Sequence, residues 1–214
     1  MSASSIELGA VFQADGDQNP IRVIAFDDDV VMYDAWWPHI QAWGMTKLTG
    51  TVFYYRLPRD WFDRRMRYLR TEEYTEKERS VHRPDLPLSF ALHDSMSWYS
   101  QRPDSVSQLD VQLAFAAEQE GVVLGHLPAQ AIYLASFGPQ GTSRPTTLIP
   151  AQNGRSLTEL EVLWHAWQLQ APYLRERQLT KGVGLHRLGI QRQKPSYYIW
   201  GSSSRLEESL RITS

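Results

Sequence analysis

The segment Thr180–Trp200, TKGVGLHRLGIQRQKPSYYIW, constrains the fold most, because it joins glycines, cations and aromatic rings without one acidic residue. Glycines let a backbone approach a ligand closely and expose its N–H groups. Cations beside them neutralise phosphate, and flat rings stack on bases. The segment therefore predicts a loop that holds a single strand of nucleic acid, RNA in preference to DNA.

The candidate RNA-binding residues all come from this segment. They are Lys181, Gly182, Gly184, His186, Arg187, Gly189, Arg192, Lys194, Tyr197 and Tyr198. Its cations would neutralise phosphates, and Tyr197 or Tyr198 would stack on a base. The same pattern also has a purely structural interpretation. Gly182 would then be the C′ cap of a preceding helix, Gly184 and Gly189 would punctuate a turn and an edge strand, and the tyrosines would face a core.

The composition of the chain indicates a folded domain. Its 214 residues are 42% hydrophobic and include eight Trp, which predicts a single domain spanning residues 1–214 with a substantial core. The absence of Cys excludes disulfides and thiolate chemistry. The chain contains no run of 18 apolar residues, so no membrane span is predicted. Its N-terminal sequence lacks the pattern of a secretory signal. We therefore expect a cytoplasmic protein.

Hydrophobic periodicity in the first half of the chain predicts strands followed by helices. Thr49–Leu57 alternates and is rich in β-branched and aromatic residues, so we expect a strand there. Pro58 then suits the first turn of a helix, in which Phe62, Met66 and Leu69 form the buried stripe. Thr75-Glu76-Lys77-Glu78 is a capping box that starts a second helix. Earlier strands are expected at Ile6–Ala14, Arg22–Phe26 and Val30–Tyr33.

The second half continues this order. Strands are expected at Ser89–Tyr99, Val122–Leu127 and Ala131–Phe137, whereas Leu109–Ala117 fits a strand or a helix and Gly138–Asn153 is expected to be a loop. A capping box at Ser156–Glu159 predicts a helix that buries Leu160, Leu163, Trp164 and Trp167. A strand ending at Trp200 and a short C-terminal helix through Leu210 would follow. This order predicts an α+β fold of mainly antiparallel sheets with packed helices.

An acidic, Trp-rich segment near the N-terminus is a candidate protein interface. Its residues are Asp27, Asp28, Asp29, Trp36 and Trp37. Trp anchors interfaces, and one strand cannot easily bury two adjacent Trp on one face. Residues 1–60 carry eight acids and four bases, a net charge of −4, which favours a basic partner. A bend that buries both Trp is the structural alternative.

Catalytic and metal-binding patterns are weak. Val23–Val31, VIAFDDDVV, resembles the first motif of haloacid dehalogenase-type phosphatases, with Asp27 as nucleophile and Asp29 as acid, but no acidic pair downstream completes a Mg²⁺ site. An acidic turn between two strands is the favoured interpretation. The six His form neither HxH nor HExxH, and His186 would lack an acid partner as a general base. We therefore expect no catalytic residue, metal or cofactor.

Gly182–Ile190, GVGLHRLGI, resembles the glycine-rich loop of the RAMP superfamily of CRISPR RNA-binding proteins. Gln191 stands where that loop has its last glycine. Leu86-Pro87-Leu88 followed by Trp98-Tyr99 resembles the central part of the type IV subunit that caps the 5′ handle of the guide RNA. The resemblance implies a ferredoxin-like, RRM-type core with insertions, in a non-catalytic subunit of an antiviral ribonucleoprotein complex. Its glycines would lie against the RNA backbone.

Three functional hypotheses follow from these patterns. The first is a cytoplasmic subunit that binds guide RNA and other protein subunits of its complex. The second is a protein-binding module, such as an immunity protein or antitoxin, whose acidic N-terminal face blocks a basic nuclease. The third is a Mg²⁺-dependent phosphatase-like enzyme that uses Asp27 and Asp29.

Overall fold

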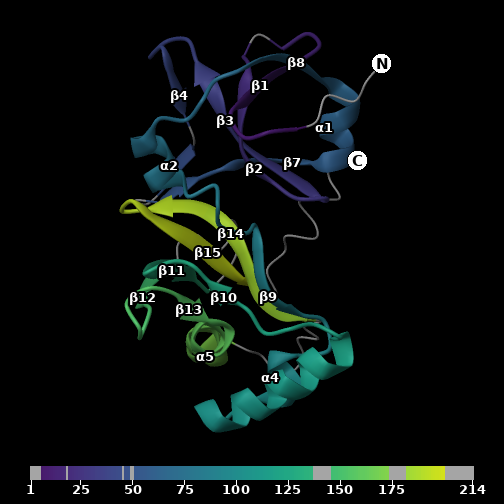
Figure 1. Cartoon of the computed structure of the whole chain (residues 1–214), viewed down its shortest axis with the longest axis vertical. Helices are drawn as coiled ribbons and strands as arrows, with labels where there is room; N and C mark the ends of the chain where they lie inside the picture. Colours follow the sequence, from purple (N-terminus) through teal and green to yellow (C-terminus); the bar gives the residue numbers. More distant parts are fainter. Residues whose placement is uncertain are drawn as a thin grey trace. The chain divides into compact units, whose positions relative to one another are not determined.

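The computed structural model describes residues 6–17, 19–44, 46–48, 51–136, 146–173 and 182–200. Helices pack on mainly antiparallel sheets, which confirms the α+β class (Figure 1). By its internal contacts the chain divides into two compact units. The first unit contains Met1–Leu88 and Gly189–Gln193, and the second contains Ser89–Leu188 and Lys194–Ser214. The single-domain organisation stays a prediction.

The first unit is built on one antiparallel sheet. Its strands are β1 (Ala10–Ala14), β2 (Ile21–Phe26), β3 (Val30–Trp37), β4 (Ala42–Gly44), β7 (Tyr55–Pro58) and β8 (Met66–Thr71). They lie in the order β4-β3-β2-β1-β8, with β7 also paired to β3. Two short strands, β5 (Thr46–Leu48) and β6 (Thr51–Phe53), pair with each other, and β6 also pairs with the end of β14 (Val183–Gln191).

Both faces of this sheet carry a hydrophobic core, because successive strand residues point to opposite sides. Phe62 of helix α1 (Arg59–Arg65) packs in one cluster with Phe12 and Val23. Neighbouring strand residues Ile24 and Met32 pack in the other cluster, which also contains Tyr74, Leu88 and Ile190. Helix α2 (Glu76–His82) contributes Val81 to this second core.

The second unit combines strands with two longer helices. Its elements are β9 (Ser89–His93), α3 (Trp98–Gln101), α4 (Val106–Glu120), β10 (His126–Leu127), β11 (Ala131–Ala135), β12 (Thr146–Pro150), β13 (Leu157–Thr158), α5 (Glu159–Gln170), the 3₁₀ turn Ala171–Tyr173, most of β14, and β15 (Lys194–Trp200). The sheet runs β12-β11-β15-β14, and β9 pairs with β14. The β11–β15 pairing is parallel, whereas β12 pairs with β11 and β9 pairs with β14 in antiparallel orientation.

Several expected elements differ from the structure. The first helix ends at Arg65, so Met66 and Leu69 belong to strand β8 instead of a helical stripe. The reason is tertiary pairing, because β8 completes the edge of the sheet beside β1. Val122–Gly125 has no regular structure, and of the expected strand at Val122–Leu127 only β10 forms.

Other differences follow from the same competition between local and tertiary preference. The expected strand over Ser89–Tyr99 stops at His93 and is followed by α3. The expected loop Gly138–Asn153 contains strand β12, which pairs with β11. The ambiguous Leu109–Ala117 is helical, inside α4. The expected C-terminal helix lies outside the described residues.

One of the two expected capping boxes forms at the predicted residues, and the other is shifted along the chain. Thr75 caps α2, and the reciprocal contacts with Glu78 are present as predicted. The second box lies two residues later than expected, at Thr158 and Glu161. The buried face of α5 is therefore Val162, Leu163 and Ala166, while Leu160, Trp164 and Trp167 are only half-buried.

The ferredoxin-like core remains an expectation. When the short helix α3 and the two-residue strands β10 and β13 are left aside, the second unit has the element order β9, α4, β11, β12, α5 and β14, which matches the β-α-β-β-α-β series of that fold. Among the described strands, however, β9 is bonded only to β14, and β15 is inserted between β14 and β11. The pairing thus establishes the α+β class and leaves the RRM-type arrangement unproven.

Candidate functional site

The glycine-rich segment is a β-hairpin, which corrects the expected loop. Strand β14 ends at Gln191, strand β15 begins at Lys194, and Figure 1 shows the two as long neighbouring arrows. Only Arg192 and Gln193 form the connection. Lys181 lies outside the described residues. Gly184 and Gly189 therefore belong to strand β14, and Gly182 lies directly before it, so their conformations have to be explained by packing against neighbouring residues.

Gly184 is required by a close approach of two strands. Its φ is +152°, and a Cβ at this position would lie 2.8 Å from the carbonyl oxygen of Ala91 and against the side chain of Leu92. The register between β14 and β9 shifts at this point, and Ala91 itself has a positive φ of 55°. Gly184 thus accommodates an irregularity in the sheet.

The other two glycines also have structural settings. Gly182 has φ +73°, and a Cβ there would meet Asp94 and the indole nitrogen of Trp200 at 3.3 Å. Gly189 is buried in β14 opposite Phe53 of β6. None of the three glycines is placed in an open loop.

Three of the expected RNA-binding side chains are enclosed by protein. Arg187 and Tyr197 are fully buried, and Tyr198 is 1% exposed. A strand of RNA cannot reach them in this structure. The two tyrosines occupy β15, where the alternative interpretation of core-facing strand residues places them.

His186 lies in an aromatic setting. Its ring stacks on Tyr198 with centroids 5.4 Å apart and meets Trp200 edge-on at 5.2 Å. Its Nδ1 is hydrogen-bonded to the hydroxyl of Ser89 at 2.9 Å, as expected for directly opposed residues of β14 and β9. These contacts fix the imidazole in place.

The turn of the hairpin exposes the remaining cations. Arg192 and Gln193 are exposed and Lys194 is half-buried. Arg192 has φ 45° and Gln193 has φ 62°. A type I′ turn requires positive φ at both of its central residues and strongly prefers Asn-Gly there. Neither Arg nor Gln relieves the steric cost of this conformation as Gly does.

The acidic triplet forms the turn between β2 and β3. The carboxylate of Asp27 accepts hydrogen bonds from the backbone N–H of Asp29 at 2.9 Å and of Val30 at 2.7 Å. Asp28 and Asp29 are exposed. This arrangement agrees with the interpretation as an acidic turn between two strands, and Asp27 is already engaged by backbone donors.

Trp36 and Trp37 lie at the opposite end of β3 from the acidic triplet. Trp36 is opposite Trp43 of β4, with ring centroids 5.5 Å apart. Trp37 packs over Gly44, where a Cβ would lie 2.8 Å from its ring, and stacks on His39. Both Trp are half-buried. The expected acidic, Trp-rich interface is therefore split between the two ends of one strand.

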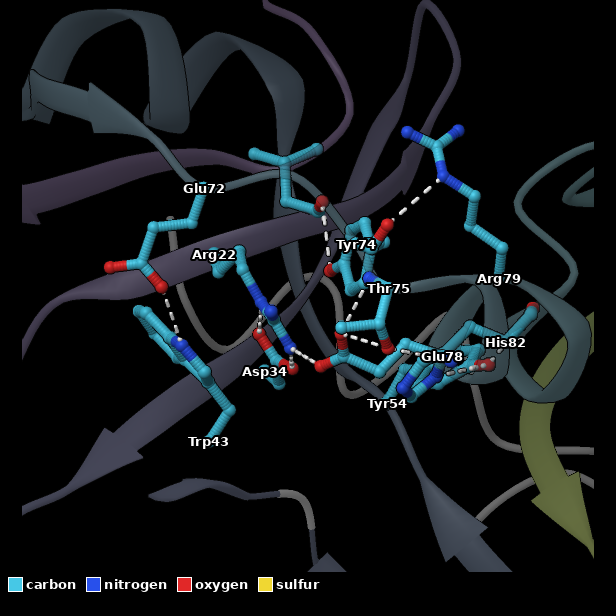
Figure 2. A network of polar contacts seen from close by, with 11 residues as sticks. Arg22, Asp34, Trp43, Tyr54, Glu72, Tyr74, Thr75, Glu78, Arg79 and His82 are labelled. Atoms are coloured by element: carbon cyan, nitrogen blue, oxygen red, sulfur yellow. Dashed lines mark hydrogen bonds and ion pairs between the residues drawn. The ribbon is translucent and has the colours of Figure 1, made fainter. Parts of the chain in front are cut away.

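A buried ion-pair network, which the sequence patterns did not reveal, occupies one face of the first unit's sheet. Arg22 is 3% exposed and forms two hydrogen bonds to Asp34, of 3.2 and 2.7 Å, and one of 3.0 Å to Glu78 of α2. Figure 2 shows its guanidinium between these two carboxylates. The guanidinium carbon also lies 4.2 Å from the ring centre of Tyr74 and 4.9 Å from that of Trp43.

The energetics of this network favour a structural role. Burial lowers the pKa of the Arg22 guanidinium, but the hydrogen bond and charge of Asp34 outweigh burial and raise it overall. Burial raises the pKa of Asp34 despite the contacts with Arg22. Since Arg22 is already met by two carboxylates and two rings, it has little capacity left for a ligand. The network joins α2 to the sheet through Glu78 and packs Trp43 of β4 against Arg22 of β2.

A second cluster that proximity in sequence did not reveal centres on His93 of β9. Its Nδ1 lies 2.7 Å from a carboxylate oxygen of Glu120, at the end of α4, and its Nε2 lies 3.2 Å from one of Glu159, at the start of α5. The other Glu120 oxygen accepts from the backbone N–H and hydroxyl of Ser95, and that of Glu159 accepts from the N–H of Gly125. The cluster ties two helices to one strand.

The described ranges contain no group of three or more His, Asp or Glu side chains placed to hold a metal ion. They also contain no helix long and apolar enough to cross a membrane. The described residues of each unit line a hollow. The hollow of the first unit, of about 350 Å³, is lined by residues that include Leu8, Phe26 and Pro84–Leu88. That of the second unit, of about 320 Å³, lies between Val106 of α4, the turn residues Gln152 and Asn153, and α5 residues that include Trp164 and His165.

No family model, curated protein or solved structure matches the chain.

Proposed function

We propose that this chain is a non-catalytic RNA-binding subunit of a cytoplasmic ribonucleoprotein complex, and that the tip of the β14–β15 hairpin contacts the RNA backbone. The similarity of Gly182–Ile190 to the glycine-rich loop of RAMP proteins supports a guide RNA of CRISPR type as the ligand. The contact surface is narrower than the sequence pattern predicts, because Arg187, Tyr197 and Tyr198 are buried.

The observation that carries the proposal is the unfavourable turn at Arg192 and Gln193. Both residues adopt positive φ at an exposed position where Asn-Gly would relieve the strain. Non-Gly residues in such conformations cost about 1–3 kcal/mol each and cluster at functional sites. At the tip of this hairpin the long cationic side chain of Arg192 can contact phosphate, which an Asn side chain cannot do.

The charge around this turn supports an anionic ligand. Segment Thr180–Trp200 contains no Asp or Glu. Within the part of the chain that the structure describes, the side chains of Arg192 and Lys194 make no hydrogen bond or ion pair. Their charges are therefore available to phosphate, which binds Arg and Lys without reading base sequence.

The buried residues of the hairpin have a supporting role in this proposal. Tyr197, Tyr198 and Ile199 of β15 are buried, and so is Ile190 at the end of β14. A tip supported on both strands loses little conformational entropy when it binds, which favours affinity. Base stacking on Tyr197 or Tyr198 is not part of the mechanism.

The test is fluorescence anisotropy of the full chain with a labelled single-stranded RNA at several salt concentrations. Arg192→Gln and Lys194→Gln should each weaken binding of all RNA sequences alike and lower the slope of log K against log salt by about 0.7. Arg155→Gln removes an exposed cation from another turn and serves as the matched control. Equal salt slopes for all three variants, or no binding by the parent chain, would remove the support for this function.

A further inference from the structure

We propose that the outer face of α4 is a docking surface for a basic amphipathic helix of a partner protein. This face is defined by Val111, Phe115, Asp110 and Glu118 and continues along the chain into Val122–Leu124. It is separate from the hairpin tip and does not depend on the RNA-binding proposal.

Helix α4 is apolar on both sides. Leu109, Leu113, Ala116 and Ala117 form its buried side. On the opposite side Val111 is 71% exposed and Phe115 is 60% exposed. These two residues are four apart and therefore adjoin on the helix surface. Among the described residues, no element covers Val111 and Phe115 on this exposed side.

The exposed apolar surface continues beyond the helix. Gly121 has φ 66° and ends α4 in a Schellman motif, in which the N–H of Val122 bonds to the carbonyl of Ala117 at 3.0 Å. The next three residues are all apolar and exposed, with Val123 at 93%. Exposed apolar side chains in such density mark interaction sites.

The negative charge of this surface favours a basic partner. From Ser105 to Gly125 the chain has three acids, Asp110, Glu118 and Glu120, and no Lys, Arg or His. Glu120 faces His93, whereas Asp110 and Glu118 are exposed, and Glu118 adjoins Phe115 because the two are three residues apart on the helix. A second copy of this face would oppose acid to acid, whereas a cationic partner is attracted to it.

The spacing of Val111 and Phe115 favours a helix as the binding element of the partner. Val111 and Phe115 form an apolar ridge along α4, and in the helical projection Glu118 and, further round the helix, Asp110 lie on one side of this ridge. Helices pack ridge into groove, and a partner helix can place apolar residues at i, i+3, i+4 and i+7 on this ridge while its flanking Lys or Arg meet the acids. One partner helix can therefore contact both the apolar pair, Val111 and Phe115, and the acids.

The experiment uses two labelled helical peptides of the same length and apolar pattern, one with Lys and one with Glu at the flanking positions. We expect the full chain to bind the Lys peptide, and Phe115→Gln and the double variant Asp110→Lys/Glu118→Lys each to weaken binding by about tenfold or more. The Glu peptide should bind the charge-reversed variant in preference to the parent. Circular dichroism of each variant verifies that α4 is retained.

Two substitutions at matched exposed positions provide the controls. Leu148→Gln alters an exposed apolar residue of β12, and Asp28→Lys reverses an exposed acid in the β2–β3 turn. Both should leave peptide binding unchanged. The proposal is overturned if the Lys peptide does not bind, if the control variants weaken it equally, or if sedimentation shows a dimer of the parent that Phe115→Gln dissociates. The last result would assign the surface to a second copy.

Discussion

Replacing His93 tests how the second unit is held together. With both ring nitrogens facing carboxylates, the imidazolium donates from Nδ1 to Glu120 and from Nε2 to Glu159. A neutral ring could donate only once. Burial lowers the pKa of His93, but the hydrogen bonds to Glu159 and Glu120 outweigh burial and raise it overall. The charged form is thus an integral part of the fold.

The magnitude follows from the burial of the three side chains. The His93 side chain is 2% exposed, that of Glu159 10% and that of Glu120 18%. His93→Gln leaves two enclosed carboxylates without the cation between them. Removing one partner of a buried ion pair costs about 3–5 kcal/mol, so the second unit should lose that much unfolding free energy near neutral pH.

The raised pKa of His93 determines whether stability rises or falls with pH. The stabilising contribution of His93 is complete below its unfolded-state pKa of about 6.5 and is lost as pH rises through the higher folded-state pKa. At the acid end, burial raises the pKa of Glu120, but the Ser95 and His93 contacts lower it overall, so stability is lost as pH falls through that folded-state pKa.

Urea unfolding over a pH series measures both effects. Amide exchange protection of β9 and α5, corrected for the intrinsic rate, reports the second unit, and His126→Gln, an exposed His of the same unit, is the control. In the parent chain protection should fall as pH rises above about 6.5, and His93→Gln should remove this slope. Identical slopes in parent and variant would refute the proposed role of the charged imidazole.

Three further predictions concern stability, measured by urea titration. Asp34→Ala leaves the 3%-exposed Arg22 without its bidentate partner and should lower the unfolding free energy by about 3–5 kcal/mol, so a loss below 1 kcal/mol would contradict a tightly coupled pair. Gly184→Val drives a β-branched side chain into Leu92 and should cost about 3 kcal/mol or more, whereas wild-type stability would show that β9 can move away. Thr75→Ala removes the cap of α2 and should cost about 1 kcal/mol, and no loss would mean that Glu78 alone sustains the helix start.

The features that the sequence predicted well depend on local chemistry. The capping box at Thr75 is confirmed because its partners are three residues apart and need no tertiary context. Strands β1, β2 and β3 likewise form where apolar runs bounded by turn residues predicted strands. Met66 and Leu69 were assigned to a helix because their helical spacing carries no information about the neighbouring strand β1.

The candidate site was harder to predict, because glycine has the same local signature beside a ligand and beside another strand. The contact between Gly184 and Ala91 joins residues 93 positions apart in sequence, so only the fold reveals it. The partners of His93 at Glu120 and Glu159 are similarly remote. The turn at Arg192 and Gln193 gave no local signal either, because a two-residue type I′ hairpin is recognised by pairs such as Asn-Gly, which this turn lacks.

The central claim is that the hairpin tip retains an unfavourable turn because Arg192 contacts RNA. The double variant Arg192→Asn/Gln193→Gly installs the sequence that this turn prefers, and Gln193→Gly alone keeps the cation. Both should raise the unfolding free energy, by about 1 kcal/mol. Only the double variant should lose RNA affinity, with a salt slope lower by about 0.7. A double variant that is more stable and binds RNA as tightly as the parent would contradict the account.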